Sequence, residues 1–142
     1  MLTQPLTSSS AVNVSGTGAV EMAQNGTNNN LIRTPTVSAT GGGRIDLRDN
    51  KLIVTTAGQT GTFTGGVYTG VSGMVASGKA GNWTGPGIVT SDTRATGVTG
   101  DLVSIGVAKV GDFKNIADTD TTTFAGATVL GTDTMAMVTY GG

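Results

Sequence analysis

TVSATGGGRIDLRDNKLIV, residues Thr36 to Val54, decides the fold of this chain because an earlier stretch repeats its pattern. Residues 11–25, AVNVSGTGAVEMAQN, align with residues 36–50 without a gap at a constant offset of 25 residues. Each copy has an apolar-x-apolar segment, a glycine-containing corner, a second apolar-x-apolar segment and an Asn corner. From Asn30 the match continues at an offset of 21 residues, which leaves about four extra residues in the loop 26–29.

Short segments of period-two alternation between Gly and Asn corners are typical of successive rungs of a β-solenoid. A single rung cannot bury its apolar face alone, so we expect the two copies to stack in parallel at roughly 4.8 Å, with Val12 beside Val37. The sequence therefore predicts a mainly β chain, a short parallel β-solenoid of about two rungs over residues 11–54. A β-rich subdomain over residues 55–142, with one or two short helices, is expected to cap it, and residues 1–10 are expected to form an extended segment that can act as a pairing strand.

Composition excludes several classes of function. The chain has 142 residues, a formal net charge of −1, and neither histidine nor cysteine. Zinc sites, thiol nucleophiles and imidazole acid–base chemistry are thereby excluded. We expect no enzyme, no cofactor, no metal site and, without a basic surface, no nucleic-acid partner. No apolar run approaches the roughly 20 residues that span a bilayer, and the N-terminus lacks the pattern of a signal peptide.

Residues after Val54 change pattern but remain rich in Gly and Thr. Residues 71–79 are the best helix candidate, because apolar residues recur at i, i+3 and i+4 and glycines 78 and 81 can end the helix. Ser91 is expected to cap a single helical turn, with Arg94 directed outward. Three further strands are predicted at residues 101–110, 124–130 and 134–140, the last two joined by a hairpin-like connection.

Four motifs carry a resemblance to a known family, over residues from about 10 to Tyr140: IDLRDNKLIV at 45–54, SG at 77–78, WTGPGI at 83–88 and FAGATV at 124–129. With these motifs the chain resembles the C-terminal module of large secreted β-solenoid proteins of Planctomycetes and related bacteria, which are similar to autotransporter passenger domains. The resemblance implies an extracellular or cell-surface location and supplies no catalytic residues. In that family a dockerin-like or PEP-CTERM segment usually follows. This sequence stops at Gly142, so neither cohesin docking nor membrane sorting is carried over.

The first copy offers an edge for self-association. Between Val12 and Arg33 its charged residues are Glu21 and Arg33, and nothing N-terminal to it is long enough to be a cap. Open β edges are normally capped or charged. We therefore predict an extracellular, non-enzymatic structural protein that self-associates, through β-edge or rung stacking, into a filament, oligomer or surface assembly. The residues of that edge are Val12, Val14, Val20 and Met22.

Two alternatives remain open. The chain can be a carbohydrate-binding module of a cell-envelope protein, with polysaccharide as partner and Trp83 and Tyr68 as stacking platforms. For Trp83 we prefer the structural interpretation, in which its side chain covers the core beneath the helix. The chain can also be an excised terminal piece of a longer β-solenoid.

The acidic residues are candidates for calcium ligands and for the carboxylate pair of a glycosidase. Asp46, Asp49 and Asn50 form the densest acidic cluster, but their spacing does not fit an EF-hand loop. A turn-stabilising role is preferred for Asp49 and Asn50. Asp118 and Asp120 form a similar loop, and no spacing singles out a pair of carboxylates for glycoside hydrolysis.

Overall fold

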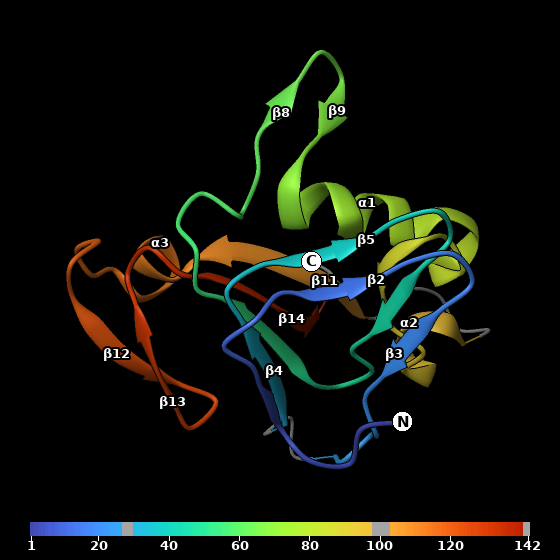
Figure 1. The fold of residues 1–142 in the computed structure, drawn as a ribbon, viewed down its shortest axis with the longest axis horizontal. Helices are drawn as coiled ribbons and strands as arrows, with labels where there is room; N and C mark the ends of the chain where they lie inside the picture. The colour runs from blue at the N-terminus through green and yellow to red at the C-terminus, as the bar shows by residue number, and fades with distance from the viewer. Residues whose placement is uncertain (27–29, 98–102, 141–142) are drawn as a thin grey trace.

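The computed structural model describes residues 1–26, 30–97 and 103–140. Strands dominate this part of the chain and helices are few, as the sequence predicts. The strands form several small sheets, the largest of which has five strands in the order β1-β4-β7-β14-β11 (Figure 1). A three-stranded sheet has the order β10-β6-β3, and three sheets have two strands each within the described ranges.

The two sequence copies pair with each other strand by strand, in parallel. We call residues 11–34 the first repeat and residues 36–54 the second repeat. In register, Val12 lies opposite Val37 and Val20 opposite Ile45, which confirms the offset of 25 residues. The paired strands are β2 (Val12–Val14) with β5 (Val37–Ala39), β3 (Ala19–Glu21) with β6 (Arg44–Asp46), and β4 (Leu31–Thr34) with β7 (Lys51–Val54).

The register of the third pair differs from the prediction by one residue. Ile32 lies opposite Leu52, an offset of 52 − 32 = 20, so Leu31 meets Lys51 and not Leu52. The alignment assumed that one apolar face sets the register, but both faces of β4 and β7 are buried here, and the pattern then specifies register weakly. Residues 27–29 of the preceding loop lie outside the described residues.

The N-terminal segment covers two strands of the first repeat. Strand β1 (Leu6–Thr7) pairs in parallel with β4, and Leu2 forms an isolated parallel bridge with Met22. The prediction of a pairing strand in residues 1–10 is confirmed, and its partner is this chain. The expectation that nothing N-terminal could act as a cap is wrong, because two short extended pieces suffice to reach two of the three strands.

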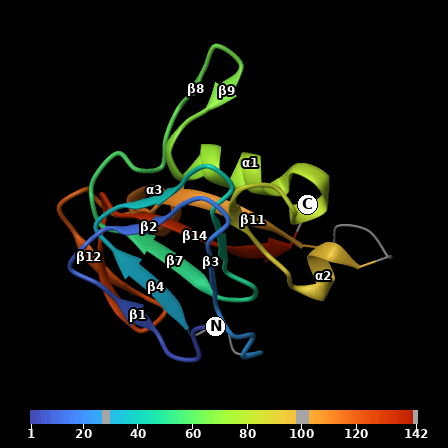
Figure 2. The same ribbon diagram turned by 45° about the vertical axis from the view of Figure 1, so that its right-hand side comes forward.

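The second repeat is covered by elements from the C-terminal half. Strand β10 (Gly87–Val89) extends β6 in parallel, and β14 (Thr134–Tyr140) pairs with β7 in antiparallel, followed by β11 (Val103–Lys109). Helix α1 (Gly70–Trp83) packs against β5 and β10. Both views place α1 and the N-terminal segment on opposite sides of the paired repeats (Figures 1 and 2).

Helix α1 confirms the prediction at residues 71–79 and continues beyond it. Its backbone leaves the helical region at Ala80, Gly81 and Asn82. The helix and β10 approach so closely that a Cβ on Gly78 would stand 2.0 Å from the carbonyl oxygen of Ile88. The glycine is therefore required by this contact, and it lies inside the helix without ending it.

Other C-terminal predictions need correction. Residues 124–130 do not form one strand, since Ala125 and Gly126 adopt positive φ and turn β12 (Thr121–Phe124) back onto β13 (Ala127–Leu130). Strand β14 therefore pairs with β7 and β11 and not with its sequence neighbour. The predicted strand 101–110 is β11, with residues 101 and 102 outside the described residues.

Helix α2 (Thr93–Thr96) is capped by Asp92 and not by Ser91, because the Asp92 carboxylate accepts a hydrogen bond from the Arg94 backbone N–H. The Arg94 side chain turns back to the same carboxylate and is not simply directed outward. Two elements remain, the short helix α3 (Val110–Lys114) and a projecting hairpin formed by β8 (Phe63–Thr64) and β9 (Val67–Tyr68).

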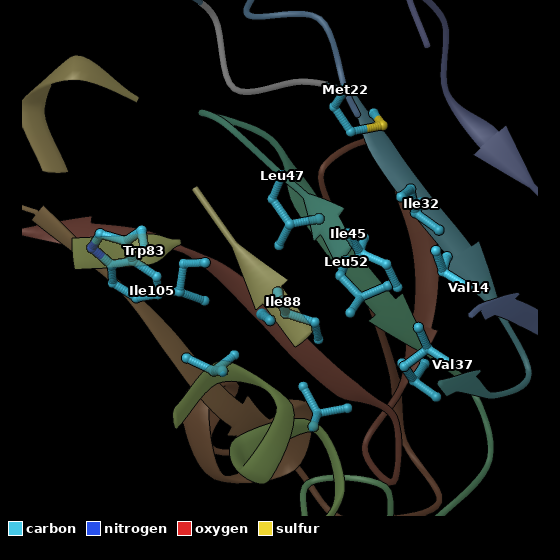
Figure 3. Close-up of a cluster of buried hydrophobic side chains, with 14 of the residues drawn as sticks. Val14, Met22, Ile32, Val37, Ile45, Leu47, Leu52, Trp83, Ile88 and Ile105 are labelled. Atoms are coloured by element: carbon cyan, nitrogen blue, oxygen red, sulfur yellow. The ribbon is translucent and has the colours of Figure 1, made fainter. Parts of the chain in front are cut away.

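The five-stranded sheet separates two apolar clusters. Ile32, Leu52 and Val54 point into the main core, together with inward side chains of β2, β3, β6, β10 and α1 (Figure 3). Leu31 and Ile53 point to the other face, where the β12–β13 hairpin and α3 cover them. The unbroken apolar run at the end of the second repeat follows from this burial on both faces. No helix in the described ranges is both long and apolar enough to cross a bilayer.

Candidate functional site

The residues predicted to form the self-association edge lie mostly in the core. Val14 is 6% exposed and Met22 is fully buried, while Val12 and Val20 are half-buried and pack on the main core. Their side chains face inward because the strand pleat alternates sides. The groups of this edge that remain accessible are backbone N–H and C=O groups. The exposed side chain on the edge is that of Asn13, which the sequence analysis did not single out.

Strand β2 ends its sheet, with β5 as its neighbour on one side and no strand on the other in the described part of the chain. Val12 donates its N–H to Thr36 and Val14 accepts from Thr40, so both direct their backbone groups toward the second repeat. Alternate residues of a strand direct these groups to opposite sides. The N–H and C=O of Asn13 therefore face outward.

The two aromatic residues proposed as a stacking platform lie before and after the main body of α1 and do not come together. Trp83 is 4% exposed and belongs to the main core, which confirms the preferred interpretation of this residue. Tyr68 is 53% exposed on the β8–β9 hairpin and contacts Phe63, with ring centroids 4.6 Å apart. Phe63 is the exposed aromatic partner that the sequence analysis missed, although two aromatic residues flanking a Gly-Gly turn were a usable signal.

The polar corners of the two repeats stack on each other. Asn25 donates through its side-chain amide to Asn50, and Asn50 donates to the carbonyl oxygens of Ala23 and Leu47. The carboxylate of Asp49 accepts from the backbone N–H groups of Asn25 and Gly26. These contacts fit the preferred turn-stabilising role for Asp49 and Asn50, and they use polar groups that are almost completely buried.

A cleft of about 460 Å³ lies on the outer face of the β3–β6–β10 sheet, and we call it the outer cleft. Its floor follows from strand register, because Glu21, Asp46 and Val89 are directly paired and all point away from the main core. Ala19 and Arg44 form the next row of the same face. Residues 81–84 at the end of α1 form one wall, and residues 90, 91 and 96 complete the lining.

The wall at the end of α1 is strained. Gly81, Asn82 and Trp83 all have positive φ, of 61°, 64° and 67°. For the two residues that carry a side chain, the left-handed conformation costs roughly 1–2 kcal/mol each. Such backbone geometry is frequent at functional sites.

Two buried donors at the outer cleft lack partners within the protein. Of the buried side-chain nitrogens in the described residues, the indole Nε1 of Trp83 and the guanidinium Nε of Arg48 make no hydrogen bond. Trp83 lines the cleft, and Arg48 contacts Glu21 of its floor through Nη2. A buried donor without a partner costs about 1–3 kcal/mol.

Charges of both signs meet in the outer cleft. The Glu21 carboxylate is paired with Arg48, and Arg44 donates to the carbonyl oxygen of Thr84. Oδ1 of Asp46 accepts from the backbone N–H of Arg48 at 2.9 Å and of Ser91 at 3.0 Å. Two carboxylates and two guanidinium groups thus balance each other around the cleft.

The acidic residues considered as calcium ligands are dispersed. Asp118 pairs with Lys109, with 2.8 Å between Oδ1 and Nζ, and Asp120 accepts from the backbone N–H of Ala117. In the described part of the chain, no three His, Cys, Asp or Glu side chains gather closely enough to hold a metal ion.

No protein-family model, curated protein or solved structure matches this chain.

Proposed function

We propose that this chain is a non-enzymatic structural module of an extracellular protein, built on a β-solenoid of two rungs, which associates with another copy through strand β2. The solenoid assignment is supported by parallel pairing of the two repeats on three successive strands, at nearly constant sequence offsets. The extracellular location is supported by the resemblance of its motifs to secreted β-solenoid proteins.

The observation that carries the proposal is the open edge of β2. The two repeats together have six outward strand edges. β1 covers the edge of β4, Leu2 reaches that of β3, α1 packs against β5, and β10 and β14 cover β6 and β7. β2 ends its sheet with no strand beyond it in the described part of the chain, as β3 and β5 also end theirs, and it carries no charged residue from Ala11 to Ser15. Uncharged open edges favour strand addition.

The geometry favours a closed pair of copies over a filament. A filament of stacked rungs needs an open edge at both ends, but the end beyond the second repeat is covered by α1, β10 and β14. Through the edge of β2, two copies can pair β2 with β2 in antiparallel about a two-fold axis, which closes the assembly. The strand has three residues, so the interface is small and we expect weak, concentration-dependent association.

The carboxylates of the chain support a structural role. Glu21 pairs with Arg48, and Asp92 binds Arg94 with 3.0 Å between Oδ1 and Nε. Asp49 accepts backbone N–H groups of the neighbouring repeat, and Asp133 accepts from Leu130 at 3.1 Å. These acidic groups hold corners and helix ends.

The test is light scattering with negative-stain electron microscopy of the purified chain over a concentration series. We expect the mass to rise from 14.1 kDa toward that of two copies. Asn13→Lys places a charge on the open edge without entering the core, and it should keep the chain monomeric. Thr123→Lys, on an exposed position of β12, is the matched control and should associate like the parent.

Two results would overturn the proposal. A parent chain that stays at the mass of one copy at every concentration does not self-associate. Undiminished association of Asn13→Lys would place the contact elsewhere than β2. Substitution of Val14 is unsuitable for this test, because a charge at a core position unfolds the chain.

A further inference from the structure

We propose that the outer cleft binds a neutral oligosaccharide, one or two sugar rings of a polysaccharide, with the indole N–H of Trp83 donating to a sugar oxygen. This role differs from stacking on an exposed aromatic ring, since the faces of Trp83 are buried. The proposal is independent of the β2 edge, because β2 belongs to the two-stranded sheet with β5 and the cleft lies on the three-stranded sheet.

The first argument is the pair of buried donors without partners. In the described residues, Trp83 and Arg48 are the two whose buried side-chain nitrogens make no hydrogen bond; Trp83 lines the outer cleft, and Arg48 pairs through Nη2 with Glu21 of its floor. Buried polar groups of native proteins are nearly always satisfied, so each exception calls for a partner. Figure 3 shows the indole nitrogen on the side of the ring turned away from Ile88 and the main core. A ligand oxygen in the cleft supplies the acceptor that the protein does not.

The second argument is the chemical balance of the lining. Arg44, Asn82 and Trp83 offer donors, Glu21 and Asp46 offer acceptors, and side-chain hydroxyls stand at positions 84, 90, 91 and 96. A sugar hydroxyl both donates and accepts, so it matches a surface on which both kinds of group alternate. The opposite charges balance, which gives no net attraction for an anion or a cation. Ala19 and Val89 provide the apolar part of the floor.

The third argument is size and preorganisation. About 460 Å³ lies within the usual range of roughly 300–1,000 Å³ for small-ligand sites. The floor rests on three hydrogen-bonded strands, and Arg44 of the floor donates to the Thr84 carbonyl oxygen of the wall. Arg44, Thr84 and Ser91 are exposed at the rim while Trp83 is buried at the bottom. The indole thus lies at the bottom of a cleft whose rim is open to solvent.

The test uses the fact that the sequence contains one tryptophan. A ¹H–¹⁵N spectrum of the whole chain has a single indole cross-peak, which reports on the proposed donor directly. The probes are cellotetraose, xylotetraose, mannotetraose and laminaritetraose, with tetragalacturonate as the anionic comparison. We expect at least one neutral tetrasaccharide to shift the indole peak saturably and to slow its exchange with solvent.

Matched variants locate the site. Trp83→Phe keeps the ring and removes the N–H, and it should weaken binding about tenfold, the contribution of one hydrogen bond. Tyr68→Phe also removes one polar group from an aromatic ring, but outside the cleft, and should bind like the parent. If Trp83→Phe lowers stability, Arg44→Gln at the exposed rim gives a second reading and should also weaken binding several-fold.

Three outcomes would overturn the proposal. The indole peak could stay unmoved by every neutral probe at millimolar concentration. Binding could remain at full strength in both Trp83→Phe and Arg44→Gln, which would place it elsewhere. Finally, tetragalacturonate alone could bind, which would show a site for anions and not for neutral sugars.

Discussion

The two ends of the paired repeats are closed in different ways. At the N-terminal end, residues 1–10 lie as an extended segment that makes backbone hydrogen bonds and buries Leu2 and Leu6 only in part. At the C-terminal end, α1, β10 and β14 form a continuous core with fully buried Val71, Ile88 and Ala136. Burial of apolar area is the main source of stability, so the C-terminal end should hold the fold and the N-terminal end should open locally.

Gly78→Val should have the largest effect on stability, because it disrupts packing at the more stable C-terminal end. The new side chain would meet the carbonyl oxygen of Ile88 at a Cβ distance of 2.0 Å, so α1 and β10 must separate. We expect a loss of about 4 kcal/mol or more in the free energy of unfolding, measured by urea denaturation. Ala76→Val, on the exposed side of the same helix, is the control and should cost less than about 1 kcal/mol. Equal effects of the two would show that helix propensity, not close packing, sets the result.

Asn50→Ala should have the second-largest effect on stability, because Asn50 lies at the contact between the two repeats. The fully buried Asn50 amide joins the corner of the first repeat to that of the second. Its removal leaves the carbonyl oxygen of Ala23 without its side-chain donor, while that of Leu47 keeps the backbone N–H of residue 50, and it should cost about 1–3 kcal/mol. Asn13→Ala removes an exposed amide whose Oδ1 accepts from the Ser38 hydroxyl of the second repeat, and because this hydrogen bond lies in solvent its loss should cost only about 0.5 kcal/mol. Thermal unfolding followed by circular dichroism distinguishes the two, and a neutral Asn50→Ala would refute the role of the stacked corners.

Leu6→Ala tests the weaker end directly. The side chain is half-buried, so its truncation should cost about 1 kcal/mol, below the 2–5 kcal/mol typical of a fully buried leucine. Hydrogen exchange sharpens the result, since the amides of Leu2 and Ser8, which bond to the first repeat, should exchange faster than those between β7 and β14. Equal protection at both ends would mean that the chain opens as one unit.

Asp92→Asn should have a small effect that depends on pH. The Arg94 guanidinium lowers the pKa of the buried Asp92 carboxyl through side-chain hydrogen bonds. A lowered folded-state pKa stabilises the fold above the unfolded value of about 3.9, and this contribution is lost as pH falls through the folded-state pKa. At neutral pH the substitution should cost about 1 kcal/mol, since Arg94 is partly exposed.

Asp133→Asn is the matched comparison of opposite sign. Burial raises the pKa of Asp133, so its charged form opposes folding at neutral pH and its protonation favours folding as the pH falls. Its removal should therefore leave neutral-pH stability unchanged or slightly higher. Urea denaturation of both variants between neutral and acid pH checks the two signs, and a parallel response of both would contradict the assigned causes.

Local repetition made the pairing of the two repeats predictable. The alternation of Val12 and Val14, repeated 25 residues later, fixes which strands meet because a slip would turn apolar side chains to solvent. The same argument failed for Leu31, where burial on both faces removes that penalty. Antiparallel pairing of β14 with β7 joins segments about 80 residues apart, and no local pattern records such a partner.

The outer cleft could be predicted only in part. The alignment of the repeats already places Glu21 beside Asp46, so a pair of carboxylates on one face was readable from the sequence. Trp83 joins them because α1 ends in three left-handed residues, two of which carry side chains that rarely adopt this conformation. Asp92 as a cap was missed for a simpler reason, because Ser91 and Asp92 are both good cap residues and neighbouring contacts decide between them.

The parallel register of the two repeats also bears on how such a chain can change its length. A duplication of about 25 residues within the gene would insert a copy whose strands meet the same neighbours above and below. The molecule would grow by roughly 4.8 Å, while the N-terminal segment and the C-terminal elements kept their present partners. The length of the molecule along the stacking direction is thus a property that recombination can change without altering either end. The outward-facing residues are free to diverge from one copy to the next.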